Sequence, residues 1–158
     1  MKILGVDPGT ARLGWGVIDN ETMIACGCLE TAAGLPEERR LEILFDELSK
    51  LIKQYRPETV AVEKLFFFKN QTTVIPVAQS RGVVLLAASQ NHLPVGSYTP
   101  LQIKQAVTGY GRAEKKQVQQ MVKSILKLKT VPRPDDAADA LAVALTHQFS
   151  YKFKSRVK

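Results

Sequence analysis

Four acidic residues lie at positions where their carboxylates could meet. Asp7 ends the apolar run that opens the chain, and Glu63 ends a second apolar run. Asp136 and Asp139 are three residues apart at the expected start of a helix, so both project from nearly the same face. If the two runs form neighbouring strands, Asp7 and Glu63 end side by side at one sheet edge, where the acidic first turn of that helix could join them.

Such a group of carboxylates could hold divalent cations. Carboxylates held close together repel one another unless cations lie between them, and ligand sets made only of oxygen suit Mg²⁺ or Mn²⁺. Two such ions about 3.5–4 Å apart can clamp the attacking and leaving oxygens of a phosphodiester during in-line displacement. The chemistry indicated by these residues is therefore metal-dependent phosphodiester hydrolysis.

Most of these acids also have a purely structural explanation. Acids at helix N-termini complement the helix dipole, which would account for Asp136 and for Asp135, the expected N-cap. Asp7 precedes Pro-Gly, where an aspartate is often a turn residue. Asp139 is harder to explain in this way, because residues 137–142 around it are too apolar for a solvated helix face.

The elements that would position these acids follow from the pattern of apolar residues. Three strands are expected over residues 3–7, 13–18 and 23–30, and their short links make them an antiparallel meander. Two further strands are expected over residues 59–63 and 94–98.

Helices are expected between and after these strands. Helical spacing and helix-terminal residues place them between Pro36 and Pro57, from about residue 70 to 91, between Thr99 and Gly109, over residues 113–128, and from the Asp135 region to about Phe149. The order predicts an α/β fold with a mixed five-stranded sheet, three antiparallel strands then two parallel ones, and helices on both faces. We expect one domain over residues 1–150 and a basic C-terminal tail over residues 151–158 that could be disordered.

The composition is that of an ordinary globular protein. The 158 residues are 45% hydrophobic and 23% charged, enough for one substantial core. No apolar run approaches the roughly 20 residues of a membrane span, and an acid at position 7 comes too early for a signal peptide, so we expect a cytoplasmic protein. Cys26 and Cys28 would share one strand face, and with both histidines distant we expect reduced packing residues rather than a zinc site.

The positive charge of the chain is concentrated in one segment. The net charge is +7, which indicates a polyanionic partner. Residues 101–133 alone carry eight basic residues and one acid. The basic residues are Lys104, Arg112, Lys115, Lys116, Lys123, Lys127, Lys129 and Arg133. Blocks of this kind are also typical of solvated surface, so charge alone does not decide for nucleic acid.

Three consecutive phenylalanines follow Glu63, in the segment VEKLFFFKN over residues 62–70. Neighbouring side chains point to opposite faces of a strand and spread around the axis of a helix. One buried face therefore cannot take all three rings, and at least one ring is expected to be exposed or held for a ligand.

Taken together, these motifs resemble the RuvC family of Holliday junction resolvases. They are GVDPGT (5–10), AVE (61–63) with Phe66 and Lys69, QIKQ (102–105) with AEK (113–115), and DAADALA (136–142). DPG alone would be a weak signal, because several phosphate-handling families carry it. The full set is specific, since the motifs follow the family's order and spacing from residue 1 to about 148.

The resemblance implies an RNase H-like fold and a homodimer in which each subunit nicks one of two opposed strands of a four-way DNA junction. It makes Asp7, Glu63, Asp136 and Asp139 the catalytic metal ligands, for two Mg²⁺ ions in each subunit with Mn²⁺ able to substitute. Some relatives have histidine at the place of Asp136. The RuvA–RuvB branch-migration assembly is implied as a partner by resemblance only.

The resemblance also implies DNA contacts. An aromatic residue three positions after the catalytic glutamate, here Phe66, would stack on bases at the crossover, where each stacked base contributes about 1–3 kcal/mol. Phe67 would support it, and Phe68 is expected in the core. Internal packing of all three rings stays an alternative.

Basic residues would contact the DNA backbone. Lys104 and Lys115 match family lysines that hold the scissile strand, and further contacts are expected from Lys69, Arg112 and Lys116. The helix over residues 70–91 is a candidate dimer element, and Arg81 on it could meet either DNA or the second subunit.

Two other functions fit part of the sequence. A nuclease of the same fold acting on structured RNA would share the Gly-x-Asp-x-Gly start, but is not expected to combine Phe66 with Lys104 and Lys115. A non-catalytic junction-binding protein would gain nothing from placing carboxylates beside phosphates. We therefore predict an endonuclease that resolves DNA junctions in recombination and repair.

Overall fold

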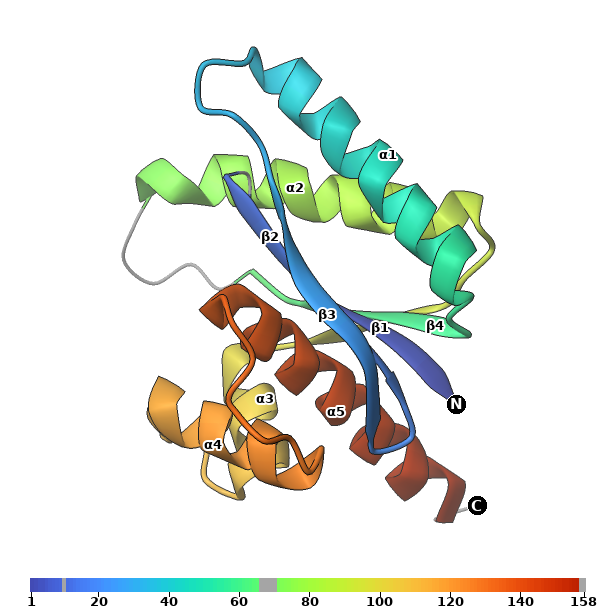
Figure 1. Cartoon of the computed structure of the whole chain (residues 1–158), viewed down its shortest axis with the longest axis vertical. Coiled ribbons are helices and arrows are strands. Elements are labelled where there is room, and N and C mark those ends of the chain that lie inside the picture. Colours follow the sequence, from blue (N-terminus) through green and yellow to red (C-terminus); the bar gives the residue numbers. More distant parts are fainter. Residues whose placement is uncertain (10, 66–70, 157–158) are drawn as a thin grey trace.

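A five-stranded mixed sheet forms the centre of the computed structural model, which describes residues 1–9, 11–65 and 71–156 (Figure 1). The strands are β1 (Lys2–Asp7), β2 (Arg12–Asp19), β3 (Thr22–Glu30), β4 (Thr59–Glu63) and β5 (Val95–Tyr98), in the spatial order β3-β2-β1-β4-β5. The first three pair antiparallel, β4 lies parallel to β1, and β5 lies parallel to β4. The predicted sheet is therefore confirmed.

Helices in the described part of the chain cover the two faces of this sheet (Figure 1). They are α1 (Glu37–Tyr55), α2 (Gln71–Gln90), α3 (Pro100–Thr108), α4 (Lys115–Ile125) and α5 (Asp135–Arg156). One hydrophobic core joins α1 and α2 to the sheet, and the other joins α3, α4 and α5 to its opposite face. Across the described parts of the chain, we find no helix with the length and apolar character that a membrane crossing requires.

The strand β1 contributes to both cores because its side chains alternate between the two faces. Leu4 and Val6 are buried in the core under α1 and α2, whereas Ile3 is buried in the core under α5. A strand covered on both faces reads as a continuous apolar run, as the start of this chain does. Asp7 is the first charged residue after that run.

Close packing brings α5 onto the sheet. A β-carbon on Gly5 would overlap the carbonyl oxygen of Ala140, and one on Gly14 would overlap the carbonyl oxygen of Asp136. Only glycine permits this approach of two backbones. The approach matters because it sets the first turn of α5 directly over the end of β1.

The helix ends differ from expectation in two places. The prediction that Asp135 is the N-cap of α5 is wrong, since the helix begins at Asp135, in whose first turn Asp136 also lies. The last helix does not end near Phe149 but continues to Arg156. No glycine or proline follows Phe149 to stop it, and the Lys152 ammonium lies 2.7 Å from the Glu21 carboxylate on the β2–β3 hairpin. The described part of the expected tail is therefore helical.

Candidate active site

The carboxyl ends of β1 and β4 place Asp7 and Glu63 at one edge of the sheet. The two strands are parallel, and their register pairs Val6 with Val62. The next residue on each strand is the acid, and both acids are partly buried. The juxtaposition expected from the sequence is therefore present.

The first two turns of α5 bring Asp136 and Asp139 to the same edge. The negative charges of both residues raise the pKa of Asp7. Asp139 also raises the pKa of Glu63. The structure thus brings all four predicted acids within electrostatic reach of one another.

Burial and mutual repulsion raise the pKa values of three of these carboxyls. Burial is the largest effect on Asp7, and the charges of its acidic neighbours help to raise its pKa to about 8, against the opposing charge of Lys115. Burial, then Asp139, raises the pKa of Glu63, while a hydrogen bond with Asp7 lowers it. Burial also raises the pKa of Asp139, while Lys115 opposes the rise. Such clustering of perturbed groups is typical of functional sites.

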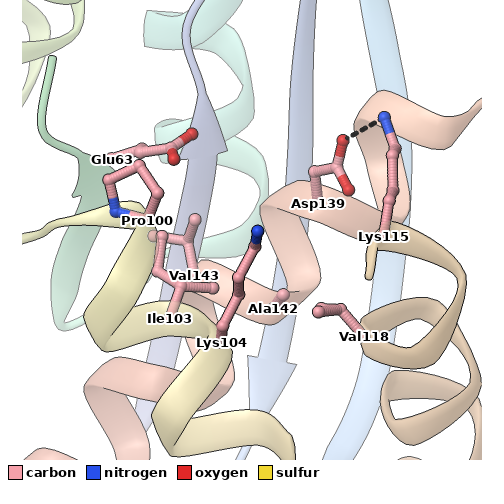
Figure 2. A pocket seen from close by; sticks show the side chains of 9 residues that line it. All are labelled: Glu63, Pro100, Ile103, Lys104, Lys115, Val118, Asp139, Ala142 and Val143. Atoms are coloured by element: carbon pink, nitrogen blue, oxygen red, sulfur yellow. Dashed lines mark ion pairs between the residues drawn. The ribbon is translucent and has the colours of Figure 1, made fainter. Parts of the chain in front are cut away.

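A cavity of about 260 Å³ opens beside these acids (Figure 2). Glu63 and Asp139 line it, and Figure 2 shows Lys104 rising from α3 between them. The Lys115 Nζ, at the start of α4, lies 2.9 Å from Asp139 Oδ2 and 3.9 Å from Asp135 Oδ2. The rest of the wall is mainly apolar, formed by Pro100, Ile103, Val118, Ala142 and Val143.

A second cavity, of about 230 Å³, is also lined by Glu63. Asp7, Pro8 and Lys64 are among the residues that line it, and it shares Glu63 and Pro100 with the first cavity. Glu63 therefore borders both cavities, one of which Asp139 also lines and the other Asp7.

Two predicted DNA-contacting residues lie away from these cavities. Arg112 is exposed in the loop before α4. Lys116 is also exposed and lines a separate hollow of about 450 Å³ that includes Tyr110. The roles of both stay predictions. The expectations for Phe66, Phe67, Phe68 and Lys69 fall outside the described residues.

The acids suit Mg²⁺ in their chemistry, though not yet in their arrangement. All four offer carboxylate oxygens, the donors that Mg²⁺ prefers, and their mutual repulsion would be relieved by a cation between them. Within residues 1–9, 11–65 and 71–156, however, no three His, Cys, Asp or Glu side chains are arranged so that they could hold a metal ion. A cation bound to Asp139 would compete with the Lys115 ammonium, which lies 2.9 Å from Asp139 Oδ2.

Sequence reasoning missed two neighbours of the acids. Ser80 on α2 is buried, and its hydroxyl donates a hydrogen bond to the carbonyl oxygen of Gly9, two residues after Asp7. The Cys28 thiol, predicted only as a packing residue, lies close enough to Asp136 for that charge to raise its pKa, after the larger effect of burial. A single serine in a helix gives no sequence signal, whereas the pairing of Asp7 with Gly14 and of Gly14 with Cys28 depends on the register of the predicted meander.

Comparison with known proteins identifies the family. The family model "Crossover junction endodeoxyribonuclease RuvC" matches residues 3–147. The chain belongs to the RuvC family. This confirms the resemblance drawn from the motifs.

Relatives in the RuvC family match nearly the whole chain. The crossover junction endodeoxyribonuclease RuvC of Pelotomaculum thermopropionicum is 52% identical over 162 residues, covering 100% of this chain and 99% of the relative. That of Fusobacterium nucleatum is 54% identical over 151 residues, covering 93% of this chain and 80% of the relative.

Solved structures of the RuvC family share the fold. Thermus thermophilus RuvC superimposes with a TM-score of 0.91 at 37% identity, covering 98% of this chain and 97% of the other. The same protein in complex with Holliday junction substrate gives 0.88 at 36% identity, covering 97% and 96%. The yeast mitochondrial Holliday junction resolvase Ydc2, at 10% identity and a TM-score of 0.65 over 99% and 86%, shows the fold alone. The expected RNase H-like fold is thereby confirmed.

Proposed function

We propose that the protein is a divalent-metal-dependent endonuclease that resolves four-way DNA junctions by nicking two opposed strands. The observation that carries the proposal is the meeting of Asp7, Glu63, Asp136 and Asp139 at one edge of the sheet, in a chain of the RuvC family. It is supported by the Thermus thermophilus RuvC structure, which is described as a complex with Holliday junction substrate.

Mg²⁺ is the proposed cofactor, two ions in each subunit with Mn²⁺ as a substitute, and the four acids are its proposed ligands. Bound Mg²⁺ would supply Lewis-acid polarisation of the scissile phosphate and activation of the attacking water. The carboxyls must be deprotonated to act as ligands. Asp7, with a pKa of about 8 in the metal-free protein, would therefore release a proton on metal binding at neutral pH.

Lys104 and Lys115 would hold the scissile strand. Both side chains reach the cavity that Glu63 and Asp139 line. An ammonium fixed beside the scissile phosphate is worth most where negative charge develops during the reaction. Phe66 would stack on bases at the crossover, supported by Phe67, and Lys69, Arg112 and Lys116 would contact the backbone of the arms.

A homodimer is the proposed assembly, with α2 as its contact. Ile75 and Leu86 on this helix are 66% and 52% exposed. Ala78 and Gly82 are exposed between them at helical spacing, so the four form one apolar stripe. Exposed apolar patches mark interaction sites, and the same stripe on a second copy would match it about a two-fold axis. Such a dimer provides the two active sites that paired nicking requires.

The setting of the reaction is proposed on the same grounds. A junction-resolving nuclease would work in the cytoplasm, in recombination and repair. The RuvA–RuvB branch-migration assembly is proposed as its partner from family membership.

The variant Asp139→Asn tests this function. It should bind a four-way junction in Ca²⁺ as the wild type does and should cleave it in Mg²⁺ at least about a hundredfold more slowly, a loss of about 3 kcal/mol of transition-state stabilisation. Asp46→Asn, on the exposed side of α1, is the matched control and should cleave normally. Wild-type cleavage by Asp139→Asn would overturn the site assignment. Cleavage of structured RNA but of no junction would overturn the proposed substrate.

A further inference from the structure

Two consecutive residues of α2 reach toward the ends of both strands that carry the proposed metal ligands. Ser80 Oγ donates a hydrogen bond of 3.0 Å to the carbonyl oxygen of Gly9, in the loop that leaves β1. Arg81 Nε donates one of 3.3 Å to the carbonyl oxygen of Glu63, and its Nη2 donates one of 3.2 Å to the Ser97 hydroxyl on β5. One turn of a helix therefore contacts the backbone beside Asp7 and the backbone of Glu63 itself.

We propose that Ser80 and Arg81 are positioning residues that hold Asp7 and Glu63 in place for metal binding. The inference rests on the proposed function only in taking these two acids as metal ligands. Neither Ser80 nor Arg81 would touch the metal or the DNA. Each would act through the backbone that carries a ligand.

The sheet pairs each of these two acids on one side only, Asp7 with Gly14 on β2 and Glu63 with Tyr98 on β5. The paired register of β1 with β4 ends at Val6 and Val62, one residue before each acid. After Asp7 comes Pro8, which has no N–H to donate to a neighbouring strand. On the β5 side, the contact extends one residue further, where Lys64 N–H donates to the carbonyl oxygen of Tyr98 at 2.7 Å. The acids thus lie where pairing between β1 and β4 stops, and further support on that side must come from outside the sheet.

The contacts from α2 supply this support. Ser80 is buried, so its hydrogen bond to Gly9 is shielded from water. Arg81 offers a planar fork of donors, which can span the Glu63 carbonyl and the Ser97 hydroxyl at once. The bridge therefore ties β4 to β5 at the residue that carries the carboxylate.

Arg81 acts on the backbone of Glu63 and not on its carboxylate. The cations that lower the pKa of the Glu63 carboxyl are Lys104 and Lys115, which line the same cavity as Glu63. The sequence left open whether Arg81 meets DNA or a second subunit, and in the structure its guanidinium is directed to the strand ends instead. Arg81 therefore leaves the Glu63 carboxylate to its hydrogen bond with Asp7 and to a metal.

The same helix carries the exposed stripe proposed as the dimer contact. Ser80 and Arg81 lie directly before Gly82, which is one member of that stripe. One side of this turn would thus face the second subunit while the other holds both ligand-bearing strand ends. A displacement of α2 would move Asp7 and Glu63 together.

The test is the affinity of the DNA-free protein for Mn²⁺, measured by isothermal titration calorimetry. Loss of a residue that orients a metal ligand typically costs about 10–100-fold in metal affinity. We expect a fall of this size in Ser80→Ala and in Arg81→Gln, and a smaller fall in Ser97→Ala, which removes only one of the two Arg81 acceptors. Arg81→Lys should recover part of the loss, since it keeps the charge without the fork. Ser89→Ala, at an exposed position of the same helix, is the control.

Thermal melting and sedimentation of each variant separate positioning from folding. Folded Ser80→Ala, Arg81→Gln and Arg81→Lys variants that bind Mn²⁺ with wild-type affinity would overturn the inference. Loss of affinity that follows the fall in melting temperature across all variants, Ser97→Ala included, would also overturn it. Junction cleavage by the wild type is measured in parallel. A wild type that binds Mn²⁺ but cuts no junction refutes the proposed function, and the Mn²⁺ affinities of the variants then still decide the positioning inference. A wild type that binds no Mn²⁺ refutes both.

Discussion

The Lys115 ammonium lies 2.9 Å from the Asp139 carboxylate, at the wall of the cavity that both share with Glu63. Asp139 is partly buried among other acids, and this lysine is the charge that opposes the rise of its pKa. The contact places one positive charge where a metal ion and a phosphate would have to be accommodated. Lys115 can therefore be tested separately for its effects on stability and on cleavage.

Replacement of Lys115 by alanine should affect cleavage far more than folding. The Lys115 side chain is 56% exposed, and exposed ion pairs contribute about 0–1 kcal/mol to stability. Loss of a charge beside the scissile phosphate costs about a hundredfold in rate. Thermal melting and single-turnover junction cleavage are the measurements, with Lys53→Ala on α1 as the control. A cleavage rate for Lys115→Ala no lower than that for Lys53→Ala would show that Lys115 has no role in cleavage.

Replacement of Asp7 by asparagine should stabilise the metal-free protein at high pH. The folded-state pKa of Asp7, about 8, lies above its ordinary value of 3.8. Its contribution to stability is therefore fully present below about pH 4 and is lost as the pH rises towards 8. At pH 8 in EDTA the variant should melt several degrees above the wild type, since the gain is at most a few kcal/mol, and the difference should shrink towards pH 4.

Added Mg²⁺ should reverse the order of the melting temperatures of the wild type and Asp7→Asn. Added Mg²⁺ binds the folded state and stabilises it, so at pH 8 it should raise the melting temperature of the wild type more than that of Asp7→Asn. Parallel melting curves for the two proteins across the whole pH range, or equal responses to Mg²⁺, would contradict the proposed role of Asp7.

Replacement of Gly14 by alanine should disturb the packing of α5 against the sheet. The added β-carbon would overlap the backbone carbonyl of Asp136, which cannot move without moving the helix. Overpacking of this kind costs about 1–3 kcal/mol, measurable by urea unfolding, and cleavage should fall as Asp136 is displaced. Gly34→Ala is the control, because its β-carbon would meet no atom within 4 Å. Equal stability of the two variants would show that α5 is not fixed by this contact.

The double change Ile75→Glu and Leu86→Glu should give a folded monomer. Both side chains are mostly exposed in the single chain, so charges there cost little in folding but would repel across a two-fold contact. Sedimentation should show a dimer for the wild type and a monomer for the variant, and paired nicking should be lost. Ile24→Glu, an exposed change on β3, is the control. A double variant that is still a dimer would show that the interface does not lie on this stripe of α2.

Much of the fold was predictable because the apolar pattern and the turn residues agree. Thr99 caps α3 with Pro100 at its first position, as the pair predicts. The neighbouring positions of Asp7 and Glu63 followed from two buried strands that each end in an acid. The predicted end of α5 was wrong because no residue after Phe149 signals a stop. The additional turns carry Lys152, which contacts a hairpin more than a hundred residues earlier in the chain.

The support of the site was the part that could not be predicted. The four acids could be predicted because carboxylates held close together repel one another and so indicate a bound cation. Ser80 and Arg81 act through backbone carbonyl oxygens, which no pattern of side chains encodes. The packing of α5 against the sheet depends on the absence of a β-carbon at Gly14. The sequence alone cannot distinguish such a glycine from one that forms a turn or a bulge.

The most direct measurement uses a synthetic four-way junction with each strand labelled in turn, incubated with and without Mg²⁺ beside duplex and flap controls. We predict paired nicks on two opposed strands, with ligatable ends, only on the junction and only with metal. Tight junction binding without cleavage under any divalent metal would contradict this result and indicate a binding protein. Equal cleavage of the duplex would contradict the selectivity for junctions.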